Sequence, residues 1–316
     1  MNGPRTIAVL GGTGFVGRAL VARLLGEGHS VRVVSRNRQR RADRWLTPGA
    51  AIVECDEYDP TALARAVAGC DVAINLVGIL NAPGLGDRSG GFQRAHVQLT
   101  CNLIAACAST GIRRLLQMSA LNAGRGRSHY LRTRGVAEEA VKASGLDWTI
   151  FQPSVIFGPG DGLFCRFDAL LRRVPVLPLA RAGAKFAPVC LHDVVEAFVR
   201  ALREPACIAQ TYELYGPEVL TLAQIVRLTA RAMERRRWVL PLPDAIGRLQ
   251  ALVMDFVPGK PFSSDNYRSL LTDAVGGIDG LHRLGITPTR IDAVLPDILG
   301  HRDDRPLRLD RYRARC

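Results

Sequence analysis

A glycine triplet near the start of the chain has the spacing of a nucleotide-binding loop. It begins at Gly11, directly after the apolar run at residues 6–10, and an amphipathic helical pattern follows at 14–28. In such a unit the first glycine permits a tight turn, the second lets a pyrophosphate approach the backbone, and the third lets the helix pack closely. Unpaired N–H groups at the helix N-terminus then favour the anion. The predicted loop residues are Gly11, Thr13, Gly14, Phe15 and Gly17.

The end of the second predicted strand indicates which dinucleotide the loop prefers. Sites that prefer NAD place an acidic residue there to bind the ribose 2′-hydroxyl, but this chain has Ser35 and Arg36, with Arg40 shortly after. Guanidinium groups match phosphate oxygens in bidentate geometry, so the two arginines favour NADP(H), with NAD(H) as the alternative cofactor. A solvated basic loop is the other interpretation. Asp56, after the third strand, is predicted to bind the adenine amino group or to cap a helix.

The elements that must position these residues alternate along the first half of the chain. The alternation of short apolar runs with helical periods indicates βαβ units, and so a parallel sheet with helices on both faces. We expect an α/β fold, a doubly wound parallel sheet of the NAD(P)-binding Rossmann type with a smaller C-terminal lobe. Residues 1–235 are predicted to form the Rossmann domain, with a lobe-forming insertion at about 158–190, and residues 236–316 a C-terminal helical lobe and basic tail. Strands are predicted at residues 6–10, 30–35, 51–55, 71–78, 113–119 and 147–154.

Composition restricts the partners and the compartment. A formal net charge of +13 favours phosphate-bearing ligands, acidic protein partners or anionic lipid. Nucleic-acid binding is not expected, because the basic stretch at 231–238 lacks an accompanying reading element. Eight cysteines without metal-ligand spacing predict free thiols in a reducing compartment and no metal site. No signal peptide or membrane-spanning run is seen, so a cytoplasmic protein is expected, with attachment to a membrane surface left open.

Several motifs together resemble the short-chain dehydrogenase/reductase superfamily, in the extended or atypical branch that includes sugar-nucleotide epimerases and dehydratases. Besides the glycine loop, they are NLVG at 75–78, YLRTR at 130–134, FQPSVIFGPGD at 151–161 and YELYGPEVLTL at 212–222. Residues 239–275 are similar to the C-terminal part of the nucleotide-binding accessory subunit of respiratory complex I and its bacterial relatives. The resemblance covers nearly the whole chain and implies a bound dinucleotide. The further cofactor residues it implies are Leu76, Val77 and Gly78, and Pro153, Ser154 and Val155 lining the nicotinamide pocket.

The same resemblance implies an acid/base site. Active members carry a Tyr and a Lys four residues apart on one helix face, and the Lys binds the nicotinamide ribose and makes the phenol a stronger acid. Here Tyr130 is present, but Arg134 occupies the Lys position, which keeps the charge without the contacts of an ammonium. The third member, a hydroxyl, falls on Ser119 or on Ser128, because the usual position holds Ala120. Alternatively, Tyr130 is only a helix-start aromatic packed at the cofactor site.

Two classes of function follow. Arg134 and the unassigned hydroxyl favour a protein that holds NADP(H) as a structural or redox-sensing ligand, with weak or absent turnover, docked on an acidic partner or a membrane-surface complex. The alternative is an active NAD(P)H-dependent oxidoreductase or sugar-nucleotide epimerase/dehydratase that uses Tyr130 as acid/base. His96 and His192 are expected to be structural. The apolar stripe at 243–257 is predicted to pack in the core or as a substrate lid, while a partner surface or an interfacial membrane helix stays open.

Overall fold

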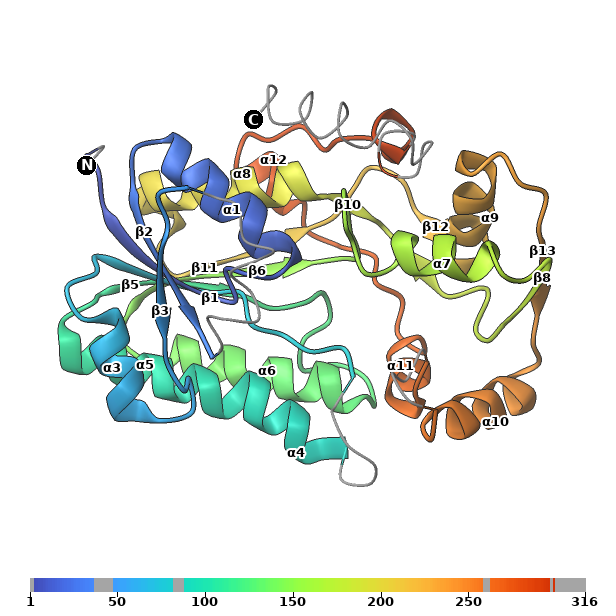
Figure 1. Ribbon diagram of the computed structural model, residues 1–316, viewed down its shortest axis with the longest axis horizontal. Coiled ribbons are helices and arrows are strands. Elements are labelled where there is room, and N and C mark those ends of the chain that lie inside the picture. Colours follow the sequence, from blue (N-terminus) through green and yellow to red (C-terminus); the bar gives the residue numbers. More distant parts are fainter. Residues whose placement is uncertain (1–2, 37–47, 82–87, 258–261, 296–297, 299–316) are drawn as a thin grey trace.

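A seven-stranded sheet forms the centre of the larger lobe, in the order β11-β6-β5-β4-β1-β2-β3 (Figure 1). Each neighbouring pair of strands is parallel. The chain proceeds outward in both directions from β1 and β4, and this reversal is the place where open α/β sheets bind ligands. The predicted doubly wound parallel sheet is confirmed. The strands are β1 (Thr6–Leu10), β2 (Ser30–Ser35), β3 (Ala51–Glu54), β4 (Val72–Asn75), β5 (Arg114–Met118), β6 (Asp147–Pro153) and β11 (Gln210–Leu214).

The chain is described by a computed structural model over most of its length. Arg40 and the basic C-terminal tail, both named in the sequence predictions, lie outside the described residues. Those residues are 3–36, 48–81, 88–257, 262–295 and 298.

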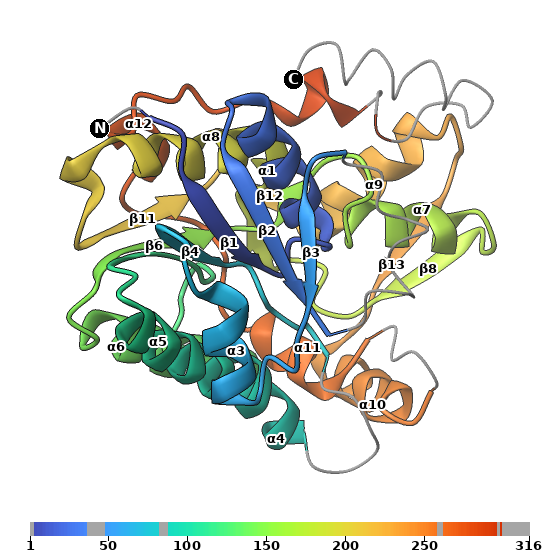
Figure 2. The same cartoon turned by 60° about the vertical axis from the view of Figure 1, so that its left-hand side comes forward.

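Helices cover both faces of the sheet (Figures 1 and 2). One face carries α1 (Phe15–Gly26), α8 (Leu191–Arg203) and α12 (Gly280–Arg283), and the other carries α3 (Pro60–Val67), α5 (Leu99–Thr110) and α6 (His129–Lys142). The turns of α4 (Arg88–Phe92) and a π-helical segment, η1 (Gln93–Gln98), lead into α5. Local signals in the sequence set the ends of these helices. The Asp59 carboxylate accepts the Thr61 and Ala62 N–H groups at the start of α3, and Gly111 ends α5 in the left-handed conformation.

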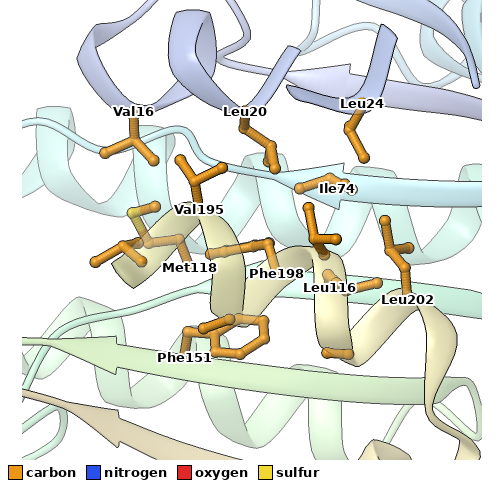
Figure 3. Close-up of a cluster of buried hydrophobic side chains, with 14 of the residues drawn as sticks. Val16, Leu20, Leu24, Ile74, Leu116, Met118, Phe151, Val195, Phe198 and Leu202 are labelled. Atoms are coloured by element: carbon orange, nitrogen blue, oxygen red, sulfur yellow. The ribbon is translucent and has the colours of Figure 1, made fainter. Parts of the chain in front are cut away.

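The core between the sheet and its upper helices shows why these segments are helical (Figure 3). Val16, Leu20 and Leu24 recur every four residues on α1 and face the sheet. Fully burying each such side chain contributes about 1.5–3 kcal/mol, so helical periodicity decides which face turns inward. The other labelled members of this cluster are Val195, Phe198 and Leu202 from α8, and Ile74, Leu116, Met118 and Phe151 from the sheet.

The smaller lobe lies beyond the carboxyl ends of the strands (Figure 1). The predicted domain boundary between residues 235 and 236 stays a prediction. Both sides of it contribute to this lobe, because Val226 and Val239 belong to one apolar cluster. The helices of the lobe are α7 (Phe164–Leu171), α9 (Leu222–Ala232), α10 (Asp244–Met254), α11 (Ser264–Ser269) and the 3₁₀ turn η3 (Ile291–Ala293). The other 3₁₀ turn, η2 (Pro205–Cys207), belongs to the larger lobe, where Cys207 packs in the core. Its short strands are β7 (Ile156–Phe157), β8 (Val176–Leu179), β9 (Lys185–Phe186), β10 (Val189–Cys190), β12 (Leu220–Thr221) and β13 (Trp238–Pro241).

The apolar stripe on α10 does not pack as core, so that interpretation of the sequence is wrong. Gly247 and Ala251 are the buried residues of this helix. The large apolar side chains of the stripe point to solvent instead. The exposed residues are Ile246, Leu249, Leu252, Val253, Phe256 and Val257.

The described part of the chain holds no disulfide and no membrane-spanning helix. Its seven cysteines are free thiols, and five of them are buried. None of its helices is long and apolar enough to cross a bilayer. Its His, Cys, Asp and Glu side chains form no group of three that could hold a metal ion.

Candidate functional site

The glycine loop joins β1 to α1 and has no room for larger residues. Gly11 has φ +75°, and its carbonyl accepts a hydrogen bond from the Gly14 N–H at 2.9 Å. A Cβ added at Gly17 would lie 2.3 Å from the Gly11 carbonyl oxygen, so the helix approaches the turn closely only with glycine there. Gly14 is the N-cap of α1 and no side chain caps this helix end. Its first N–H groups therefore face outward, as a pyrophosphate requires.

The segment after β4 lies directly against this loop. A Cβ at Gly11 would meet the Leu76 carbonyl carbon and the Val77 nitrogen, each at 3.1 Å. The Leu76 N–H donates to the Leu10 carbonyl, and the buried Asn75 side chain accepts the Val77 N–H at 3.1 Å. The structure thus brings the two predicted cofactor segments, one after β1 and one after β4, to the switch point of the sheet.

The carboxyl ends of β2 and β3 form the neighbouring part of the site. Ser35 is buried, whereas the side chain of Arg36 is 55% exposed and lies 3.7 Å from the Glu57 carboxylate. The guanidinium carbons of Arg36 and Arg94 lie 5.8 and 4.1 Å from the centre of the Tyr58 ring. Sequence reasoning missed Glu57, Tyr58 and Arg94. The acidic residues around position 56 were a signal for Glu57, but the local sequence does not show which of them contacts Arg36.

Asp56, predicted for the adenine or for a cap, takes part in a local turn. Its carboxylate accepts the Tyr58 N–H at 3.0 Å, and its carbonyl accepts the Asp59 N–H. The Asp56 side chain is exposed, so one of its oxygens is still open to a ligand.

Helix α6 carries Tyr130, and two polar groups fix its first turn. The Ser128 hydroxyl is fully buried and accepts the Leu131 N–H at 3.1 Å, so it serves as the N-cap. The Asp265 carboxylate of α11 accepts the His129 N–H at 2.7 Å and the Tyr130 N–H at 3.1 Å. Ser128 is therefore committed to the backbone and does not supply the missing catalytic hydroxyl.

Arg134 lies one turn after Tyr130 and is buried. Its Nη1 donates to the carbonyls of Val77, at 3.2 Å, and Met118, at 2.9 Å, so the guanidinium bridges the ends of β4 and β5. A Cβ at Gly78 would lie 1.9 Å from Nη2, so glycine at 78 makes room for the arginine. The guanidinium carbon is 5.6 Å from the centre of the Tyr130 ring. Within the described part of the chain, Nε of Arg134 is buried without a hydrogen-bond partner.

Ser119 follows β5 and is buried beside Glu138, the next residue of the Tyr130 face of α6. Its Oγ makes no hydrogen bond of standard geometry to another described residue. Burial raises the pKa of Glu138, against the opposing contacts of Ser119 and Gln152. Gln152 Nε2 donates to both Glu138 oxygens, at 2.8 and 2.9 Å. These side chains adjoin a cavity of about 270 Å³ between α6, the end of β6 and the loop at 122–125, which the sequence did not predict.

His96 holds the loop after β4 against α6. Its Nε2 accepts the Ile79 N–H at 3.2 Å, so Nδ1 carries the proton and donates to the Thr133 hydroxyl at 2.9 Å. Burial, with a smaller effect of the Arg134 charge, lowers the pKa of His96 to about 2. The imidazole also packs edge-on against Tyr130, 5.5 Å between ring centres. His96 is a neutral structural residue, as predicted.

His192 begins α8, as predicted from its position before Asp193. The Asp193 carboxylate, 3.9 Å from His192 Nδ1, raises the pKa of His192. The buried Asp193 carboxylate also accepts the Thr289 N–H and hydroxyl, at 2.7 and 2.8 Å. The pair therefore connects α8 to the C-terminal segment and lies outside the Tyr130 cluster.

The segment after β6 connects the sheet to the smaller lobe. The Pro153 carbonyl accepts the Leu121 N–H at 3.0 Å, and the Ser154 hydroxyl donates to the Ala274 carbonyl at 2.8 Å. Val155 packs against the apolar cluster of Phe157. Ser154 is thus used by the fold, and what this segment offers a nicotinamide is shape more than free polar groups.

These observations fit a dinucleotide. The glycine cradle and the open helix N-terminus suit the pyrophosphate, and Arg36 stands at the end of β2. At the other end, Arg134 Nε is buried without a hydrogen-bond partner among the described residues, and a ligand hydroxyl or amide could supply one.

Comparison with known proteins agrees with this geometry. A family model described as NAD(P)H-binding matches residues 11–162. The NADH dehydrogenase [ubiquinone] 1 alpha subcomplex subunit 9 of Arabidopsis thaliana is 29% identical over 284 residues, covering 84% of this chain and 70% of that protein. Ceramide reductase of Caulobacter vibrioides is 29% identical over 238 residues, covering 75% and 74%. The solved UDP-glucose 4-epimerase of Thermotoga maritima has the same fold, with TM-score 0.74, 15% identity, and coverage of 93% and 97%.

Proposed function

This chain belongs to the NAD(P)H-binding, epimerase-like family of atypical short-chain dehydrogenases/reductases, and we propose on that premise that it holds NADP(H) as a resident ligand with weak or absent turnover. The glycine loop binds the pyrophosphate, and Leu76, Val77 and Gly78 border the dinucleotide. A bound nicotinamide would supply hydride chemistry, while this chain supplies binding and orientation.

The observation that carries this proposal is the position of Arg134. In an active site of this family the corresponding Lys binds the nicotinamide ribose and supports the tyrosine as an acid. Here the guanidinium donates to the Val77 and Met118 carbonyls and is buried, so it is used to join two strand ends. A planar guanidinium fixed in this way does not reproduce the contacts of a mobile ammonium.

The preference for NADP(H) over NAD(H) rests on Arg36. No acidic residue ends β2, and the ion pair of Arg36 with Glu57 is long at 3.7 Å. Because the Arg36 side chain is half exposed, it can turn to a 2′-phosphate with bidentate geometry. Arg40 is proposed as the second cation that contacts the 2′-phosphate. Asp56 is proposed to bind the adenine amino group.

An active oxidoreductase or sugar-nucleotide epimerase/dehydratase is the second candidate, with Tyr130 as acid/base. It is favoured by the Ser119 hydroxyl, which is buried beside the Glu138 carboxylate directly after β5, where a catalytic serine could act. The two relatives named above correspond to the two candidates, since one is named as a subunit of an NADH dehydrogenase and the other as a reductase.

Partners and compartment complete the proposal. A formal charge of +13 suits docking to an acidic protein or a membrane-surface complex. We propose that the protein resides in the reducing cytoplasm, because its buried cysteines are thiols. Burial raises the pKa of Cys107 to about 12 and that of Cys190 to about 11, which keeps these two thiols unreactive.

Native mass spectrometry and calorimetry test the binding proposal. NADPH should remain bound through purification, and Arg36→Ala should weaken NADPH but not NADH. Arg113→Ala, the same charge change at an exposed position before the amino end of β5, opposite the carboxyl ends that carry the glycine loop, should alter neither. Failure to bind any pyridine dinucleotide would refute both candidate functions. NADPH oxidation that depends on an added ketone, quinone or sugar nucleotide and is lost in Tyr130→Phe would replace the resident-ligand proposal with the enzyme.

A further inference from the structure

Helix α10 is turned the opposite way from an ordinary surface helix. An amphipathic helix normally buries its large apolar residues and exposes polar ones. In α10 the inward face consists of small residues, since Gly247 approaches Ala180 and Ala251 is buried in the same cluster as Tyr267. Its large apolar residues point away from the protein. Packing within this chain therefore does not account for the apolar face.

Other exposed apolar residues lie at the same end of the molecule as the helix. The four large apolar residues within α10 span an arc of about 120°, at about 3.6 residues per turn. Strands β8 and β13 lie at the same end of the molecule in both views (Figures 1 and 2), and Trp238 on β13 is 76% exposed. We call this surface the α10 patch. It consists of Ile246, Leu249, Leu252, Val253 and Phe256, with Val176, Trp238 and Leu240 from the two strands.

Charges border the patch but do not interrupt it. No charged residue lies on the apolar arc of α10, and the exposed Arg248 stands at its side. Arg235 and Arg236, also exposed, precede Trp238 by three and two residues. These three features correspond to the layers of an anionic bilayer. Apolar side chains suit its hydrocarbon interior, tryptophan suits the interface, and arginines suit the negatively charged headgroups.

The other occupants of such a face fit less well. A second copy of this chain would bring a further net charge of +13 to the contact, and like charges oppose association. A membrane-spanning role does not suit α10, because 11 residues are about half of the length needed to cross the hydrocarbon core. The helix is long enough to lie in the plane of the interface.

We propose that the α10 patch docks this protein on an anionic membrane surface. The helix lies parallel to the bilayer with its large apolar residues below the headgroups, and the bordering arginines contact the anionic lipids. This inference goes beyond the proposed function and does not depend on whether the bound dinucleotide turns over.

Vesicle flotation tests the proposal with the full chain. The protein should float with vesicles of phosphatidylcholine and phosphatidylglycerol, and less with phosphatidylcholine alone. Raising the salt from about 0.05 to about 0.5 M should reduce binding, because it screens the lipid charge. The double variant Leu249→Ser/Phe256→Ser should lower the partition coefficient by about tenfold or more.

Matched variants separate loss of the patch from loss of apolar surface in general. Val136 and Ile278 are 52% and 62% exposed and lie outside the patch, so Val136→Ser/Ile278→Ser should float like the original protein. All variants should bind dinucleotide equally, which shows that they fold. Equal flotation of the patch and control variants would overturn the proposal. So would absence of flotation on any vesicle, or a dimer seen by light scattering that is lost in the patch variant while vesicles remain unbound.

Discussion

Replacing His96 with glutamine should make the fold less sensitive to acid. His96 is 1% exposed, and both of its ring nitrogens are used by the Ile79 N–H and the Thr133 hydroxyl. Burial, together with the Arg134 charge, lowers the pKa of the imidazole from 6.5 to about 2. The folded protein therefore keeps His96 neutral at every pH at which it is ordinarily handled, whereas the unfolded chain protonates it below its normal pKa.

The size of the effect follows from proton linkage. Because the folded pKa is the lower one, the unfolded state binds the extra proton, and stability falls as the pH falls below about 6.5. Each pH unit is worth about 1.4 kcal/mol while only the unfolded state is protonated. From pH 7 to pH 5, His96 should thus lower the free energy of unfolding by about 2 kcal/mol.

Urea unfolding at pH 7 and pH 5 measures this difference. The original protein should lose about 2 kcal/mol more than His96→Gln between the two pH values, since the other groups cancel in the comparison. His192 is the matched control, because the neighbouring Asp193 carboxylate raises the pKa of His192 and makes it stabilising below its normal pKa. His192→Gln should therefore lose more stability on acidification than the original protein. Equal pH dependence of His96→Gln and the original protein would show that His96 is solvated or charged.

Three other substitutions test the site. Gly17→Ala should weaken dinucleotide binding about a hundredfold or more in calorimetry, since its Cβ would lie 2.3 Å from a backbone oxygen; Gly26→Ala, with nothing within 4 Å in the same helix, should bind normally. Asp265→Ala should lower the unfolding free energy in urea by about 1–2 kcal/mol through loss of a helix cap. Gly78→Ala should displace the Arg134 guanidinium, because Nη2 lies 1.9 Å from the new Cβ. Loss of a charge-assisted hydrogen bond should then lower the free energy of unfolding by about 1.5–3 kcal/mol. An unchanged urea midpoint would contradict the prediction for Asp265→Ala or for Gly78→Ala.

The cofactor loop was predictable because its signals are local. The turn at Gly11, the apolar run before it and the helix after it lie within one short segment, and each has a fixed steric or electrostatic role. The predicted site residues also follow strands of one parallel sheet, whose carboxyl ends share one edge.

The rest of the site depends on contacts between distant segments. Sequence spacing placed Arg134 one turn from Tyr130, but the two carbonyls that accept from it come from other strands. The capping of α6 by Asp265 joins residues 135 positions apart, and no local pattern marks it. The raised pKa of Glu138 likewise comes from burial, which only the packed sheet provides and which outweighs the opposing hydrogen bonds from Gln152.

Helix α10 shows a different limit. Its period correctly predicted an apolar stripe, but periodicity does not say which face of the helix turns inward. The usual assumption favours the larger side chains, whereas here Gly247 and Ala251 are inside because the neighbouring segment at Ala180 approaches closely.

The distant cap on α6 also bears on the order of events at the ribosome. The Tyr130 N–H bonds to a carboxylate synthesised 135 residues later. At about 5–20 residues per second, translation takes about 7–27 s to reach that partner, and the ribosomal tunnel adds to the delay. During this time the nascent chain can assemble β1 to β6, but the helix that carries the tyrosine still has an unsatisfied first turn. The tyrosine site is therefore completed late in biosynthesis, after the sheet. A chain released before residue 265 would have the glycine loop but would lack the carboxylate that fixes the first turn of α6.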